Sequence, residues 1–316
     1  MGRYVLKRIL LLIPVILVVI ILVYTLMYLA PGDAAAMQLG ADFTEEAYQE
    51  LRHSLGLDRP FIIQIGEYMY NLFFKLDFGV SWATGASVAD QLMIRVPRTL
   101  KLGIFSIIIS SVVGILLGVN AAVHQSTWRD YGSTVLALIG GSMPGFFVAL
   151  VLVILFAYKL KLLPAFGMST WKHWILPVFS TAVTSMAVLT RQTRSSMLEV
   201  INSDYVIMAK GKGCTKRSVI YRHALPNALI PVITVIGTNF GNIMGGGLII
   251  ETVFSIPGVG FYIVEGCNAR DYNVVLACTI VISAFFSVVM LLVDLVMAAV
   301  DPRIKSQFAA RKKRKA

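Results

Sequence analysis

Charged residues are scarce in this chain, and long stretches contain none. Only 14% of the 316 residues are Asp, Glu, Lys or Arg, whereas 57% are apolar. A soluble chain of ordinary composition carries about a quarter charged residues. The composition therefore argues against an ordinary soluble enzyme or binding domain and indicates a protein of the lipid bilayer.

The motifs of common catalytic sites are also missing. There is no G-x-x-x-x-G-K-[ST], so the chain has no P-loop and is not expected to hydrolyse ATP. G-x-S-x-G and H-E-x-x-H are absent, and the four histidines show no metal-ligand spacing. We therefore predict no catalytic residue, no metal and no cofactor. The three cysteines lack a paired spacing, so we expect no structural disulfide.

The chain has instead a series of apolar runs of about 20 residues, the length that crosses a bilayer core. They predict an all-α integral membrane protein with six transmembrane helices. The predicted spans are Ile9–Ala30, Leu102–Val123, Ser133–Ala157, Trp174–Thr190, Leu225–Ile250 and Val274–Val300.

Lys and Arg predict the orientation. Six spans place both termini on one side, and most of the 28 Lys and Arg residues fall on that side. Because cytoplasmic loops are rich in Lys and Arg, both termini are predicted to be cytoplasmic. The basic tail, residues 305–316, is expected to lie on anionic lipid rather than to bind nucleic acid.

The predicted organisation has four parts. Residues 1–30 form the cytoplasmic N-terminus and the first span, and residues 31–97 form a small extracytoplasmic cap of short helices and loops. Residues 98–304 form a five-helix core that contains a cytoplasmic loop at 191–226, and the basic tail follows.

Within that loop, Tyr205–Pro226 is basic and punctuated by glycine. Gly213 separates two short amphipathic runs, and only glycine adopts the positive φ of such a reversal at little cost. Pro226 suits the first turn of the next span, where its missing N–H costs nothing. We predict a helical knob against the membrane face that docks on a partner, while an ordinary helix end at Gly213 remains the alternative.

The predicted fifth span carries three glycines four residues apart, Gly237, Gly241 and Gly245. Small residues at this spacing let helix backbones approach closely. The stripe predicts either tight helix packing or a face that lines a moving interface or a translocation path. In the second interpretation, the glycines near Gly245 supply a flexible break.

Asp294 is an acid inside the last predicted span, and intramembrane acids are candidates for function. It lies about two turns from the cytoplasmic end. A structural or snorkelling role and a role in transport both remain open.

The cytoplasmic loop resembles the EAA loop of ABC-transporter permeases, which reads E-A-A, three residues, Gly, nine residues, I-x-L-P. Here Ile207, Met208 and Ala209 fill the first triplet and Gly213 has the family's spacing. His223–Pro226 (HALP) stands for I-x-L-P. The first two positions and the isoleucine depart from the pattern.

Further segments resemble the same family in order along nearly the whole chain. They are Arg3–Ala36, Leu55–Pro60, Leu76–Ser81, Pro97–Leu102, Asn227–Ile233, Glu251–Gly260, Arg270–Tyr272 and Asp301–Ile304. The chain resembles a permease subunit of the dipeptide, oligopeptide and nickel family, of the first-permease, dipeptide-permease-B-like type.

This resemblance implies a type I ABC importer permease fold and a set of partners. They are a second, homologous permease, two cytoplasmic ATPase subunits and an extracytoplasmic solute-binding protein. The EAA loop would act as a coupling helix in a cleft of one ATPase, and ATP-driven closure would rock the spans between inward- and outward-facing states.

The resemblance also assigns roles to residues. The residues expected to couple to the ATPase are Ala209, Lys210, Lys212, Gly213, Lys216, Arg217, Leu225 and Pro226. The basic side chains, Arg222 included, fit acidic ATPase residues or lipid headgroups equally well. Candidates for the outer turn or gate are Glu251, Phe254, Pro257 and Gly258. Glu251 there would meet a peptide's amino group or be a plain loop acid.

Three functions remain open from the sequence. The first is a permease subunit that imports di- or oligopeptides. The second is a subunit of the same machinery that imports nickel or a nickel chelate, and the third is a membrane protein without a transport role. The third needs paired catalytic groups at membrane depth, which the sequence lacks. Peptide is favoured over nickel because the histidines are in loops and the methionines are dispersed.

Overall fold

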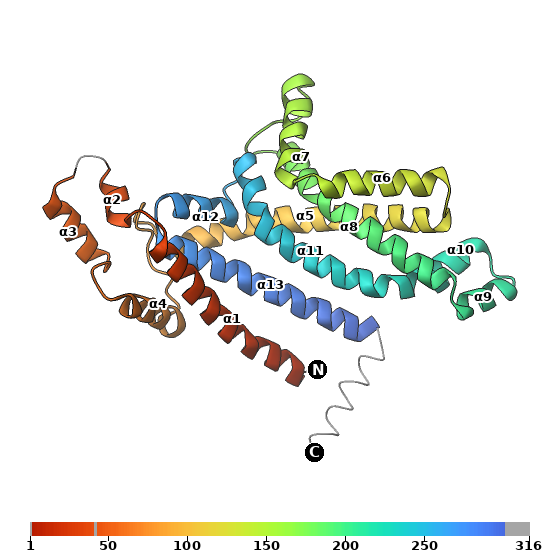
Figure 1. Ribbon diagram of the computed structural model, residues 1–316, viewed down its shortest axis with the longest axis horizontal. Helices are drawn as coiled ribbons and strands as arrows, with labels where there is room; N and C mark the ends of the chain where they lie inside the picture. Colours follow the sequence, from red (N-terminus) through yellow and green to blue (C-terminus); the bar gives the residue numbers. More distant parts are fainter. Residues whose placement is uncertain (1, 41–42, 301–316) are drawn as a thin grey trace, which may run out of the picture. The chain divides into compact units, whose positions relative to one another are not determined.

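A computed structural model describes residues 2–40 and 43–300 (Figure 1). Its named elements in these residues are all helices, as predicted. Asp301–Ile304 and the predicted tail lie outside the described residues. The helices form two compact units, one comprising the residues up to Leu100 with Ser255–Ser287, the other Lys101–Phe254 with the residues from Val288 onward.

In the first unit, three short helices connect the long helices α1 and α5, and two further helical segments come from later in the chain. Its elements are α1 (Gly2–Leu29), α2 (Ala34–Leu39), α3 (Glu45–Ser54), α4 (Phe61–Lys75), the start of α5 (Val88–Val123), α12 (Val259–Asn268) and the first part of α13 (Tyr272–Val300). Asp33 and Thr44 cap α2 and α3, since each side chain accepts a hydrogen bond from the first turn.

Apolar and aromatic side chains from α1, α4 and α13 form one core of this unit. Tyr24 meets the ring of Tyr272 edge-on, with ring centroids 5.2 Å apart. The same core contains the buried side chains of Ile20, Met27, Tyr68, Leu72 and Leu276. These contacts attach α4 to two long helices.

Buried Asp271 holds the loop before α5 against the start of α13. Its carboxylate accepts hydrogen bonds from Ser81 Oγ (2.6 Å), from the Ala83 amide (3.3 Å) and from the Val274 amide (3.2 Å). It therefore satisfies an otherwise free N–H of the first helical turn and orders a loop distant in sequence.

Replacing Asp271 with Ala is expected to destabilise the protein by about 2 kcal/mol, because buried donors lose a charged acceptor. The measurement is the melting temperature in detergent. Asp90→Asn, a change at an exposed acid on α5, is the control and should leave it unaltered. Equal melting temperatures for Asp271→Ala and the unaltered chain would contradict this account.

The second unit is built around one central helix. Its elements are the rest of α5, α6 (Trp128–Ser142), α7 (Gly145–Leu152), η1 (Val153–Lys159), η2 (Trp171–Trp174), α8 (Ile175–Ile201), α9 (Asp204–Gly211), α10 (Lys216–Ser218), η3 (Val219–Ala224), α11 (Leu225–Val253) and the end of α13. Helix α8 contacts α6, α7 and α11 (Figure 1).

Among the described residues, five helical segments are long and apolar enough to cross a membrane: Leu10–Leu29, Val88–Val123, Trp171–Ile201, Lys216–Gly245 and Tyr272–Ala299. They overlap the predicted first, second, fourth, fifth and sixth spans. The predicted third span is not a straight helix. Its residues form Trp128–Ser142 and Gly145–Lys159, which meet at 100°. Pro144 explains the break because it disfavours helical geometry in the preceding residue, and Met143 is extended (φ −86°, ψ 129°). If this pair is one span, the total is six.

Two predicted boundaries shift. The predicted cap includes residues 88–97, but helix α5 begins at Val88. These residues form its first turns, and Pro97 lies inside the helix. Helix α8 continues to Ile201, so the first residues of the predicted loop 191–226 are still helical.

Candidate functional site

The segment after α8 forms two short helical stretches joined at Gly213. Helix α9 ends in a Schellman motif: the Gly213 amide donates to Lys210 O (3.0 Å), and the Cys214 amide donates to Ala209 O (3.3 Å). Gly213 has φ +80°, which L side chains adopt at a cost. The predicted glycine turn is therefore itself a helix C-cap, so the two interpretations of Gly213 describe one geometry.

One side of this knob is packed onto the transmembrane helices. Ala209, predicted to pack closely, is 7% exposed and lies in an apolar cluster. The cluster joins α9 and η3 to α5, α8 and the start of α11 through Val119, Ala122, Met197, Val206, Val219, Ala224 and Ala228. Half of its buried members are alanines, and small side chains of this kind allow helices to approach closely.

The other side of the knob, which we name the loop face, combines basic and apolar side chains. All of its members are exposed: Lys210, Lys212, Lys216, Arg217, Arg222, Tyr205, Ile207, Met208 and Tyr221. Ile207 and Met208 are 54% and 60% exposed, whereas isoleucine and methionine side chains are usually buried in folded proteins. A mixed apolar and charged surface of this kind suits a protein partner.

The loop face has a groove of about 530 Å³, lined by Thr215, Arg217, Ser218, Tyr221, Arg222 and Pro226. Pro226 lies in the first turn of α11, as predicted, and Leu225 beside it is half-buried. The Asn227 side chain donates a hydrogen bond to Tyr205 Oη at 2.9 Å. This contact ties α9 to the start of α11.

The glycine stripe lies inside α11, which continues as a helix through Gly247. The predicted flexible break is therefore wrong for this structure, because the helical backbone is uninterrupted there. The three glycines also differ in their surroundings. A Cβ on Gly237 would lie 2.3 Å from Val293 Cγ2 on α13, whereas one on Gly245 would meet no atom within 4 Å. Gly241 is half-exposed.

Replacing Gly237 with Ala is expected to cost about 2 kcal/mol, because the methyl group overlaps a stiff β-branched side chain. Detergent melting curves measure it. The double variant Gly237→Ala, Val293→Ala should recover most of the loss, and Gly245→Ala is the matched control. A destabilisation that Val293→Ala does not relieve would argue against this contact.

The remaining pathway candidates lie beyond the stripe. Glu251 and Phe254 are 0% and 1% exposed. Glu251 is in the last turn of α11, so the interpretation of a plain loop acid is wrong. At a rise of about 1.5 Å per residue, Glu251 is about 40 Å along the helix from Leu225. Glu251 therefore lies far along α11 from the coupling candidates Leu225 and Pro226.

Pro257 and Gly258 belong to the turn between α11 and α12, within the first unit. The Arg98 guanidinium donates to Pro257 O at 3.0 Å, and Thr99 Oγ1 accepts from the Val259 amide at 2.8 Å. Gly258 is the N-cap residue of α12. The turn is therefore anchored to α5. Asp294, in the second unit, is half-buried in α13.

An ion pair that no sequence pattern indicated joins α6 to α8. Arg194 Nε and Nη2 donate to Asp130 Oδ1 and Oδ2 at 2.5 and 2.8 Å. The Asp130 side chain is 4% exposed and also accepts from the Ser126 amide at 3.0 Å. From the sequence, Arg194 lies just beyond the predicted fourth span, and Asp130 lies 64 residues before it, so no local pattern pairs them.

Comparison with known proteins shows the family. Residues 114–306 match the model of the binding-protein-dependent transport system inner membrane component, and residues 1–103 match the N-terminal model of such a membrane component. The chain belongs to this family of ABC permeases. It is a membrane permease subunit rather than an enzyme, as the sequence predicted.

Individual relatives match over almost their full length. The chain is 39% identical to the dipeptide transport system permease protein DppB of Alkalihalophilus pseudofirmus, covering 96% of this chain and 100% of that protein. It is 36% identical to the glutathione transport system permease protein GsiC of Escherichia coli K12, covering 96% and 99%.

A solved structure confirms the predicted type I ABC importer permease fold. A chain of the MetNI methionine ABC transporter, in inward-facing conformations, superposes with a TM-score of 0.59 at 16% identity. The match covers 67% of this chain and 96% of that one. At this identity the likeness concerns the fold alone.

Proposed function

We propose that this subunit forms half of a translocation pathway for di- or oligopeptides and is driven by ATPase subunits that bind the loop face. The identity to a dipeptide permease over the full length supports the choice of solute class. The loop face supports the docking site, because exposed Ile207 and Met208 lie beside five exposed basic residues on a knob packed against α5 and α8.

In this proposal the second half of the pathway is a homologous permease, and both termini are cytoplasmic. Two ATPases bind beneath the pair, one at each loop. Movement at the loop face passes to the spans through the small-residue cluster around Ala209, because closely packed helices move as one body. A solute-binding protein delivers peptide to the cap side.

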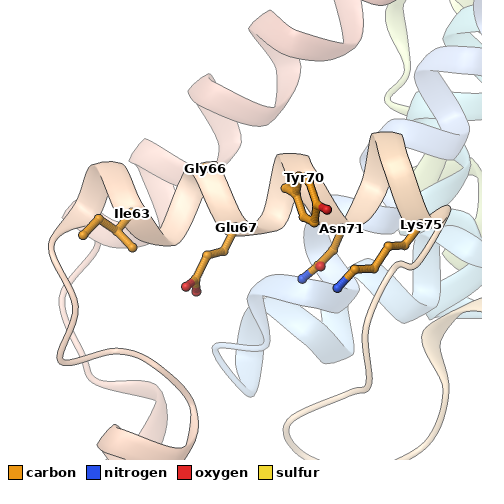
Figure 2. Close-up of a pocket in the computed structure, with 6 residues that line it drawn as sticks. All are labelled: Ile63, Gly66, Glu67, Tyr70, Asn71 and Lys75. Carbon is orange, nitrogen blue, oxygen red and sulfur yellow. The ribbon is translucent and has the colours of Figure 1, made fainter.

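The exposed side of α4 supports a place for that binding protein. A shallow pocket of about 540 Å³ runs along one face of the helix, with Glu67, Asn71 and Lys75 on it (Figure 2). Tyr70 lies on the same face and is 55% exposed. The face combines an exposed tyrosine, a residue type enriched at protein interfaces, with charged side chains of the kind found at interface rims.

Co-purification from the native membrane, followed by mass spectrometry, tests the assembly. We expect a second permease and P-loop ATPases to elute with the chain. A chain that elutes alone, or only with copies of itself, would overturn the proposal.

Charge reversal separates the two roles left open for the basic residues. Lys216→Glu with Arg217→Glu is expected to reduce ATPase co-elution at least about tenfold, because like charges replace an attraction to an acidic partner. The matched control is Lys159→Glu with Lys161→Glu, two exposed lysines at the end of η1 and just after it. Unchanged co-elution of the Lys216→Glu, Arg217→Glu variant would indicate that these side chains contact lipid headgroups instead of an ATPase.

A further inference from the structure

A second pocket lies entirely within the first unit, among α1, α4, the loop before α5 and the start of α13. Its volume is about 180 Å³. Five of its lining residues are aromatic, namely Tyr24, Tyr68, Phe78, Trp82 and Tyr272, so we name it the aromatic pocket. Trp82 lies against Tyr272, with ring centroids 5.2 Å apart.

The electrostatics of the aromatic pocket favour a cation. Glu67 and Asp77, both exposed, line it, and no Lys, Arg or His is among its described lining residues. Glu67 forms an ion pair with Arg59. Asp77 accepts a hydrogen bond from the Gly79 amide at 2.8 Å, which leaves its negative charge unneutralised. The pocket thus carries aromatic faces and one excess negative charge.

Tyr68 supplies the observation that points to a ligand. Its side chain is only 9% exposed, and its hydroxyl makes no hydrogen bond to any described residue. In contrast, Tyr24 Oη donates to Gln64 Oε1 (2.8 Å) and Tyr272 Oη donates to Met27 O (3.1 Å). Burial raises the pKa of Tyr68, so its hydroxyl stays neutral and can accept a hydrogen bond. A buried hydroxyl without a partner is uncommon in native structures.

We propose that the aromatic pocket binds a primary ammonium group. The aromatic faces attract the cation through their quadrupoles, Asp77 supplies the opposite charge, and Tyr68 Oη accepts one N–H. The volume is below the roughly 300–1,000 Å³ of pockets that enclose whole ligands, so the site takes an end group. The group belongs to a free amine-bearing solute or to an aminophospholipid headgroup. This inference does not rest on the proposed transport function.

The test measures binding to the full chain in nanodiscs of phosphatidylglycerol, which carries no amine. Trp128, Trp171 and Trp174 are replaced with Phe, leaving Trp82 as the one tryptophan, and its fluorescence is followed while ethylammonium chloride is added. We expect saturable binding. The melting temperature of the unaltered chain should rise with the same ligand, since ligands that bind the folded state stabilise it.

Two variants locate the binding. Asp77→Asn keeps an oxygen acceptor for Gly79 but removes the charge, and is expected to weaken binding about tenfold. Tyr68→Phe is also expected to weaken binding, yet it should leave the melting temperature without ligand unchanged, because the hydroxyl makes no hydrogen bond within the described part of the chain. Asp90→Asn, which lies outside the pocket, is the matched control.

The source of the ammonium group follows from repeating the titration in phosphatidylethanolamine nanodiscs. A weaker apparent affinity there means that the headgroup occupies the pocket, and an equal affinity means that it takes soluble amines; both outcomes support the proposal. No binding of ethylammonium in phosphatidylglycerol, or equal affinities for Asp77→Asn, Tyr68→Phe and the unaltered chain, would overturn it.

Discussion

Replacing Gly213 with proline is expected to abolish solute uptake while the protein remains in the membrane. The residue has φ +80°, which the proline ring forbids, and its amide donates to Lys210 O. Proline therefore removes both the turn and a hydrogen bond that ends α9. The loop face would lose its shape, but the spans, which fold around other contacts, would remain.

The measurement is uptake of a labelled dipeptide by cells in which this chain is the sole copy, with immunoblotting of the membrane fraction. Gly213→Ala should give a partial defect, because a left-handed conformation costs a non-glycine residue about 1–2 kcal/mol and a Cβ there meets no atom within 4 Å. Gly211→Ala, also free of neighbours, is the matched control. Normal uptake by Gly213→Pro would refute the coupling role.

Replacing Asp130 with Ala is expected to destabilise the second unit by about 3 kcal/mol, at the low end for a broken buried ion pair. The low end applies because the Arg194 side chain is 30% exposed and can turn toward water. The Ser126 amide would lose its acceptor as well. Since α6 packs on α8, uptake is also expected to fall.

A double-mutant cycle in detergent melting experiments isolates the pair. Asp130→Ala, Arg194→Ala and the double variant should reveal a coupling energy of about 2 kcal/mol between the two side chains. Asp130→Asn tests the charge alone, because the amide keeps one oxygen acceptor. Additive effects of the two single changes would show that the ion pair contributes little to the α6–α8 contact.

Local patterns determined much of this protein. Apolar runs of bilayer length predicted six spans, five of which overlap long apolar helices in the described residues. The family motif located the glycine turn at Gly213. Both signals lie within a few dozen consecutive residues. The same motif indicated the family that the comparisons confirm. Pro144 was visible as well, but its effect on the third predicted span needed the backbone geometry at Met143.

Tertiary structure decided the features that join distant residues. Asp271 lies 190 residues from Ser81, and Asp130 lies 64 residues from Arg194, so no local period signals either contact. The stripe at Gly237, Gly241 and Gly245 predicted close packing, yet only the fold shows that Gly237 meets Val293. The burial of Glu251 likewise depends on which helices pack around it. Periodicity is a property of neighbouring residues, whereas burial and ion pairing depend on which helices meet.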